Sequence, residues 1–113
     1  MTTTFVETAA FTRRIVKLGL EDALRRLEAE LADRPTAGDL EPGTGGLRKI
    51  RMPDPRRGKG KRGGARVYYL VVPRRQLIYL VFVYGKDEAE MLTGGQRRLV
   101  AALVSQIKAE LRT

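Results

Sequence analysis

The side chains best suited to chemistry in this sequence are the basic residues of the segment from Arg48 to Arg66, in which Asp54 is the only acid. The nine basic residues are Arg48, Lys49, Arg51, Arg56, Arg57, Lys59, Lys61, Arg62 and Arg66. The whole chain has a formal net charge of +9, so nearly all of its excess charge lies in this segment. Charge concentrated in one segment indicates a polyanionic partner, whereas charge that serves solubility would be spread along the chain.

The spacing of three of these cations indicates a phosphate site. Lys49 and Arg51 are two residues apart on a predicted strand, so they share one face, and Arg66 opens the next predicted strand. Pairing of the two strands would bring the three side chains together. A fixed guanidinium group can bind two phosphate oxygens at once through two N–H groups, and it stabilises negative charge that develops in a transition state. The alternative is that these cations simply line the solvated face of a sheet.

The chain contains no histidine and no cysteine. This excludes the usual neutral-pH base, disulfides, thiolate zinc sites and cysteine nucleophiles. Any acid–base step must use lysine, arginine, tyrosine or carboxylate side chains. Asp39 and Glu41 lack the spacing of metal ligands, and we expect neither a metal nor another cofactor.

The loop predicted from Pro53 to Gly64 combines glycine with most of the basic residues. Its glycines lack the spacing of a Walker loop, so they favour flexibility and close approach of backbone to RNA over nucleotide binding. Tyr84 ends a later strand, where either base stacking or packing could use its ring. The residues expected to contact RNA or the ribosome are Arg48, Arg56, Arg57, Lys59, Lys61, Arg62 and Tyr84.

The elements that must position these residues form an α+β pattern. Predicted strands cover Thr3–Glu7, Leu47–Met52, Ala65–Val72 and Leu77–Tyr84, and predicted helices cover Thr8–Leu18, Glu21–Asp33 and a segment capped by Thr93 and Gln96 that runs to about Leu111. We therefore expect one domain over residues 1–113, with a strand and a helical pair, then an antiparallel sheet, then a C-terminal helix. A single helical layer would leave the other face of the sheet free.

The N-terminal residues lack the pattern of a signal peptide, and the longest apolar run, Leu77–Tyr84, is far shorter than the roughly 20 residues of a membrane span. We therefore expect a cytoplasmic protein without a membrane partner.

Three segments of the sequence resemble the HigB branch of the RelE/ParE superfamily, the toxins of type II toxin–antitoxin systems. They are residues 43–51 (Gly-Thr-Gly-Gly-Leu-Arg-Lys-Ile-Arg), 58–69 (Gly-Lys-Gly-Lys-Arg-Gly-Gly-Ala-Arg-Val-Tyr-Tyr) and 79–86 (Tyr-Leu-Val-Phe-Val-Tyr-Gly-Lys). The resemblance covers most of the chain and implies a RelE-like fold. It also implies a metal-independent endoribonuclease that cleaves mRNA on the ribosome by attack of the RNA's own 2′-hydroxyl, which inhibits translation.

The resemblance also implies partners and residue roles. The partners are a HigA-like helix-turn-helix antitoxin, the ribosome with its mRNA, and operator DNA reached only through the antitoxin. Lys49 and Arg51 correspond to two cations that act at the cleaved phosphate, Arg66 to an arginine that stabilises the phosphorane, and Lys86 to a basic residue after the last strand. Asp87, where RelE has a second basic residue, departs from the pattern.

Two other functions are compatible with the same residues. One is a gyrase-targeting toxin of the ParE type, and the other is an RNA-binding module without catalysis; fold alone does not separate them. If the cleavage hypothesis is right, Arg66→Ala should abolish cleavage and spare ribosome binding. Arg56→Ala combined with Arg57→Ala should weaken binding and flatten its salt dependence.

Overall fold

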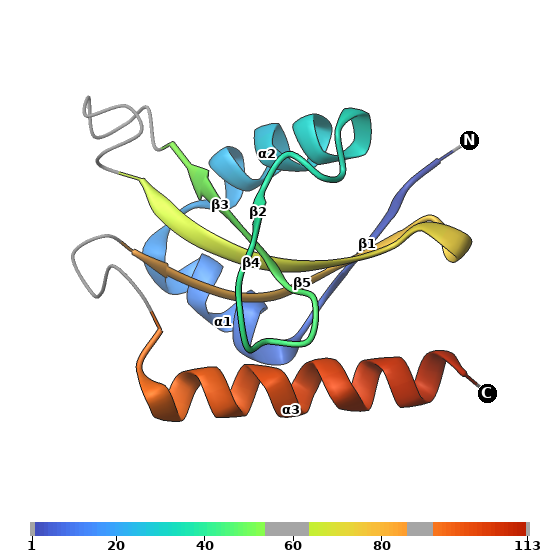
Figure 1. Cartoon of the computed structure of the whole chain (residues 1–113). Helices are drawn as coiled ribbons and strands as arrows, with labels where there is room; N and C mark the ends of the chain where they lie inside the picture. The colour runs from blue at the N-terminus through green and yellow to red at the C-terminus, as the bar shows by residue number, and fades with distance from the viewer. Residues whose placement is uncertain (1, 54–63, 86–91, 113) are drawn as a thin grey trace.

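A computed structural model describes residues 2–53, 64–85 and 92–112 of the chain. In chain order the elements are β1 (Thr4–Glu7), α1 (Ala9–Leu18), α2 (Glu21–Asp33), β2 (Asp39–Leu40), β3 (Arg48–Met52), β4 (Ala65–Val72), the short 3₁₀ helix η3 (Pro73–Arg75), β5 (Leu77–Gly85) and α3 (Gly94–Leu111). The described residues thus form an α+β fold with three α-helices and one five-stranded sheet (Figure 1).

The helices begin and end where the local signals predict. The Thr8 side chain accepts a hydrogen bond from the Phe11 amide at the start of α1, and Gly19 ends this helix in the left-handed conformation. At the start of α3, Thr93 and Gln96 form a reciprocal capping box. No helix within the described ranges is both long enough and apolar enough to span a bilayer.

The sheet has the strand order β1-β5-β4-β3-β2. Strands β2 to β5 pair antiparallel, but β1 pairs parallel with β5, so the expectation of a wholly antiparallel sheet is wrong. An alternating pattern predicts a strand but not the direction of its partner. The two residues of strand β2 carry no strand pattern of their own, and the strand is defined by its pairing with β3.

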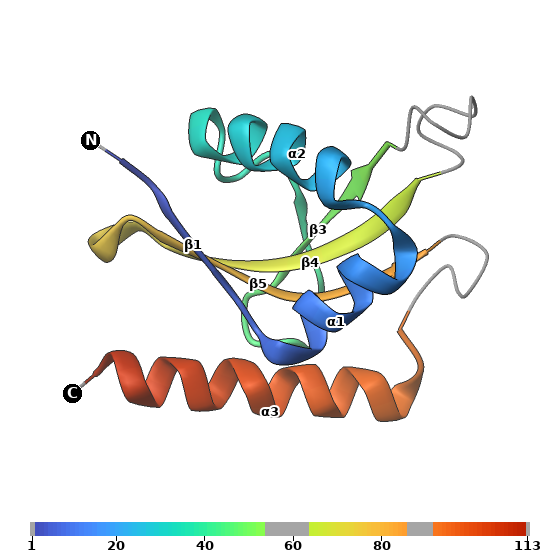
Figure 2. The same ribbon diagram turned by 180° about the vertical axis from the view of Figure 1, so that it is seen from behind.

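Helices cover both faces of the sheet, which corrects the expectation of one free face (Figures 1 and 2). On one face, α1 and α2 enclose a core that includes Phe11, Leu31 and Tyr69. On the other face, α3 packs through Val100 and Val104 against Leu70 and its neighbours. Leu99 precedes the buried Val100 in α3, but it is 60% exposed, so its side chain lies outside this core. Ile50 and Val67 belong to the core under α1 and α2, so by alternation along β3 and β4 their neighbours Arg51 and Arg66 lie on the α3 face.

Candidate functional site

Two cross-strand rows of polar and aromatic side chains lie on the α3 face of the sheet. In the first row, Arg51 of β3 pairs with Arg66 of β4, which pairs with Tyr84 of β5. Directly opposite residues in an antiparallel sheet project to the same side, with Cβ atoms about 4.5–5.5 Å apart. The second row aligns Lys49 with Tyr68 and Phe82. The prediction that strand pairing brings Lys49, Arg51 and Arg66 to one face is confirmed.

Arg66 is the most unusual member of this site. Its side chain is buried, with 8% of the residue exposed, and within residues 2–53, 64–85 and 92–112 its Nη1 atom has no hydrogen-bond partner. Its cross-strand neighbour is another cation, Arg51. Like charges directly opposite one another are destabilising, and a buried guanidinium nitrogen without a partner adds a desolvation cost. An anion bound between the two guanidinium groups would offset both costs.

Two tyrosines support this region from β4 and β5. The phenolic oxygens of Tyr68 and Tyr84 lie 3.5 Å apart, and their ring centroids lie 5.9 Å apart. Burial first, and then the hydrogen bond to Tyr84, raises the pKa of Tyr68 far above its ordinary value. Tyr68 is therefore a neutral phenol at physiological pH, able to donate a hydrogen bond but unable to accept a proton as phenolate.

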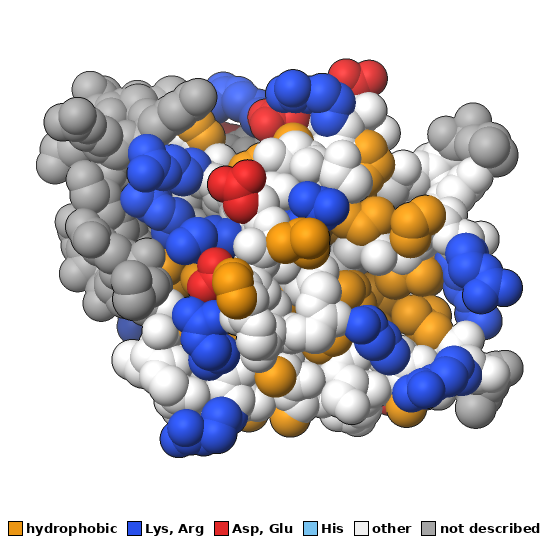
Figure 3. Space-filling view, in the orientation of Figure 1, with side chains coloured by type: hydrophobic (Ala, Val, Ile, Leu, Met, Phe, Trp, Pro, Cys, Tyr) orange, Lys and Arg blue, Asp and Glu red, His pale blue; other side chains and the backbone are white. Residues whose placement is uncertain are grey.

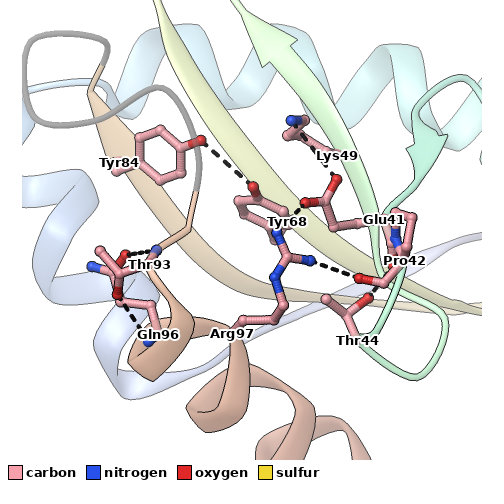
Figure 4. A network of polar contacts seen from close by, with 9 residues as sticks. All are labelled: Glu41, Pro42, Thr44, Lys49, Tyr68, Tyr84, Thr93, Gln96 and Arg97. Carbon is pink, nitrogen blue, oxygen red and sulfur yellow. Dashed lines mark hydrogen bonds and ion pairs between the residues drawn. The ribbon is translucent and has the colours of Figure 1, made fainter.

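A carboxylate that the sequence analysis did not assign lies beside Lys49. One carboxylate oxygen of Glu41 is 3.7 Å from Lys49 Nζ, and the other accepts a hydrogen bond from Arg97 of α3 at 3.0 Å. The Glu41 side chain is only 12% exposed, against 31% for Lys49 and 32% for Arg97. Figure 4 shows Glu41 between these two cations, with Tyr68 close by. The partly buried network restrains the ammonium group of Lys49.

The turn after β2 holds Glu41 in place through backbone contacts. The Glu41 amide donates to the Leu47 carbonyl at 2.8 Å, and the buried Thr44 hydroxyl donates to the Glu41 carbonyl at 2.7 Å. Arg97 also donates to the Pro42 carbonyl at 2.6 Å, which ties the turn to α3. Gly43, Gly45 and Gly46 all have positive φ, so the Thr-Gly-Gly run has a conformational role.

Another cation reaches the second row from α1. The guanidinium carbon of Arg14 lies 5.3 Å from the ring centroid of Phe82, and Arg14 Nε donates to the Val83 carbonyl. The second row therefore runs from Lys49 through Tyr68 and Phe82 to Arg14. The cations of the two rows therefore come from α1, β3 and β4. The two that pair directly, Arg51 and Arg66, come from β3 and β4.

The remaining predicted site residues fall into two groups. Arg48 projects away from Lys49, and its Nη1 donates to the Gly38 carbonyl at 2.7 Å, which gives it a structural contact. Tyr84 is 2% exposed, so its ring packs inside the protein and offers no open surface for base stacking in this structure. The predictions for Arg56, Arg57, Lys59, Lys61, Arg62 and Lys86 lie outside the described residues.

Glu41, Arg97 and Arg14 were missed because no local pattern marks them. Arg97 follows Glu41 by 56 residues and Arg14 precedes Val83 by 69, so only tertiary packing joins them. A weak signal was present for Glu41, because it stands next to the glycine-rich segment that precedes Lys49. These contacts become visible only in the folded structure, because each joins two segments that are distant in the sequence.

Gly64, part of the segment used for the resemblance, has a steric role. A Cβ atom added at this position would lie 2.0 Å from the Met52 carbonyl oxygen, closer than any side chain tolerates. The ends of β3 and β4 can therefore approach each other only with glycine here. This steric role of Gly64 was not predicted from the sequence.

Among the described residues, no three or more histidine, cysteine or carboxylate side chains group where they could hold a metal ion. The arrangement instead offers fixed positive charge and one restrained carboxylate, beside the neutral and fully buried phenol of Tyr68. Such a set can bind a phosphodiester and stabilise added negative charge on it. No protein-family model matches the chain.

Proposed function

We propose that this protein is a ribosome-dependent mRNA endoribonuclease that acts as the toxin of a type II toxin–antitoxin system of the HigB kind, with a RelE-like fold. The observation that carries the proposal is the pairing of Arg51 with Arg66, whose buried Nη1 has no partner in the described part of the chain. A fold gains nothing in stability from two opposed guanidinium groups. A phosphate that gains charge during cleavage is the ligand such a pair would stabilise.

The proposed chemistry is the one that the resemblance to the RelE/HigB toxins implies. The 2′-oxygen of the RNA attacks the adjacent phosphorus, the O2′–P bond forms, and the P–O5′ bond breaks, which leaves a 2′,3′-cyclic phosphate and a 5′-hydroxyl. Arg66 and Arg51 would bind the non-bridging oxygens as their charge increases, and Lys49 would hold the phosphate from the neighbouring row. The 2′-hydroxyl loses its proton to a base and the departing 5′-oxygen gains one; neutral Tyr68 does not act as that base.

The electrostatic character of the chain supports an RNA target over DNA gyrase. Twenty-two basic residues stand against 13 acidic ones, and the excess is concentrated in the sequence segment from Arg48 to Arg66. Binding to ribosomal RNA uses many phosphate contacts, each of which steepens the dependence of affinity on salt. This function implies a cytoplasmic site of action and a HigA-like antitoxin as the cognate partner.

The proposal is tested by incubating purified protein with mRNA alone and with mRNA on programmed ribosomes, followed by gel analysis and identification of the new RNA ends. We expect cleavage only on ribosomes, with cyclic phosphate ends, and its loss in Arg66→Ala. Ribosome binding measured by sedimentation should survive this substitution, because Arg66 is buried and adds little to the docking surface.

Each alternative function predicts a different result in the same experiment. Ribosome binding without strand scission by the folded parent would reject the nuclease and leave a binding module. Absence of ribosome binding together with inhibition of gyrase supercoiling would favour the ParE-type activity. Arg25→Ala is the control variant, because Arg25 is exposed and pairs locally with Asp22 of the same helix.

A further inference from the structure

A groove lies at the end of the sheet opposite the proposed phosphate site. It is formed where the last residues of β4 pass the C-terminal turns of α3, and its floor contains Leu70, Val72 and Leu111. Val72 lies six residues beyond Arg66 on the same strand, about 20 Å away along an extended chain. The hairpin groove, as we call this hollow, is therefore separate from the two cationic rows.

The hairpin groove is large enough to receive side chains of another molecule. Its volume is about 420 Å³, within the range of small ligand sites. Contacts between distant segments hold its walls in place. Arg75 of η3 donates to the Leu111 carbonyl at 2.8 Å, and Lys108 donates to the Gly45 carbonyl. The groove is thus a preformed feature of the packing between the hairpin and α3.

The charges around the groove all have one sign. Arg74, Lys108 and Arg112 line it, Arg75 lines the adjoining hollow, and none of the lining residues in the described part of the chain is acidic. Figure 3 shows this hollow as an apolar area bordered by lysine and arginine side chains above the C-terminal part of α3. An aliphatic floor inside a cationic rim is complementary to a ligand with apolar and acidic groups side by side.

We infer that the hairpin groove is a docking surface for an acidic amphipathic peptide segment of a partner protein. The aliphatic side chains of the segment would fill the floor, and its carboxylates would pair with Arg74, Lys108 and Arg112. Single-stranded RNA is a poorer match, because nucleic-acid grooves use aromatic rings for base stacking and the described residues that line this groove include no aromatic side chain. The inference does not depend on the proposed cleavage activity.

The test uses a short synthetic peptide with leucine on one face and glutamate on the other, labelled with fluorescein. Binding to the full chain is measured by anisotropy, and the bound surface is mapped by amide chemical shifts. We expect shifts at Leu70, Val72 and Leu111. We also expect a peptide with serine in place of leucine to bind at least about tenfold more weakly, because it cannot fill the apolar floor.

A matched pair of variants separates the groove from general attraction to a basic protein. Arg74→Glu with Arg112→Glu reverses two groove charges, and Arg13→Glu with Arg26→Glu makes the same change in net charge on exposed positions of α1 and α2. We expect the groove variant to lose at least about tenfold in peptide affinity and the control to change little. Both should retain any ribosome-dependent cleavage.

Three results would overturn the inference. Equal weakening by the two double variants would show non-specific charge attraction. Peptide shifts confined to the surface around Lys49 and Arg51 would place the peptide in the other site. Displacement of the peptide from the Leu70 and Leu111 amides by a single-stranded RNA oligonucleotide that binds there more tightly would make the groove a nucleic-acid surface.

Discussion

The two faces of the sheet bury different kinds of side chain. Against α1 and α2 the core is mostly aliphatic and includes the fully buried Phe11 and Tyr69, whose hydroxyl donates to the Pro35 carbonyl. Against α3 the core includes Tyr68 and Tyr84, and it adjoins the buried charge of Arg66. Both faces are covered by helices, yet only one combines burial with unbalanced charge among the described residues.

The two faces thus contain two classes of residue. Those on one face stabilise the fold, and some of those on the other lower its stability. Burial of apolar surface on the α1–α2 face contributes stability without specific chemistry. On the α3 face, the Arg51–Arg66 pair opposes stability, and natural proteins tolerate such local conflicts mainly at functional sites. Substitutions on the two faces should therefore change different quantities.

The largest expected effect is a loss of stability on the α1–α2 face. Phe11→Ala should lower the free energy of unfolding by about 3–5 kcal/mol, because the ring is fully buried and its removal leaves a cavity. Urea denaturation followed by circular dichroism measures this. The cleavage rate per folded molecule should stay close to that of the parent. A selective loss of cleavage in fully folded protein would contradict the division between the faces.

Arg51→Met should have the opposite profile. Arg51 is exposed and faces Arg66, so its removal relieves like-charge repulsion and should leave stability unchanged or slightly higher. The cleavage rate on programmed ribosomes should fall by roughly tenfold to a hundredfold, because one phosphate ligand is lost. Single-turnover kinetics at saturating protein would measure it. Full activity in this variant would remove Arg51 from the site.

Glu41→Gln tests the restraint on Lys49. Loss of the carboxylate leaves Lys49 and Arg97 without their common partner, so cleavage should fall about tenfold and the free energy of unfolding by about 1 kcal/mol. Arg97→Gln is the matched control, because it removes the bonds from α3 but keeps the Glu41–Lys49 pair. The control should lose similar stability and retain most of its activity. Equal losses of activity would make the network merely structural.

The smallest expected effect concerns Glu28 of α2. Burial, followed by repulsion from Glu7, raises the pKa of this carboxyl above its ordinary value of 4.5. The folded state then binds the proton more tightly than the unfolded state, so stability falls as pH rises from 4.5 through the folded pKa. Glu28→Gln should flatten that part of the stability curve, as measured by urea denaturation across pH. Glu21→Gln, at the start of the same helix, is the control.

Local patterns predicted most of the elements, and the reasons are physical. Threonine caps, a terminal glycine and helical spacing define α1 and α3, and alternating β-branched and aromatic residues define β3, β4 and β5. Strand β2 and the parallel pairing of β1 depend on partners distant in sequence. The position of α3 on the second face depends on how the packed layers are arranged, which its own stripe does not specify.

The candidate site was predicted in part for the same reason. Alternation along β3 and the place of Arg66 on β4 were enough to predict that three cations share a face. The burial of Arg66 follows from packing around it, and the contact between Glu41 and Arg97 joins segments 56 residues apart. Neither property has a local pattern in the sequence.

The central claim, that Arg66 serves phosphate chemistry and not the fold, is tested most directly by Arg66→Met. The substitution keeps an unbranched side chain and removes the buried charge, so the free energy of unfolding should rise by about 1 kcal/mol. The measurement is the single-turnover rate of mRNA cleavage on programmed ribosomes by protein shown to be folded. The account predicts a fall of roughly 10²- to 10³-fold. Cleavage by the folded variant at the parental rate would contradict it.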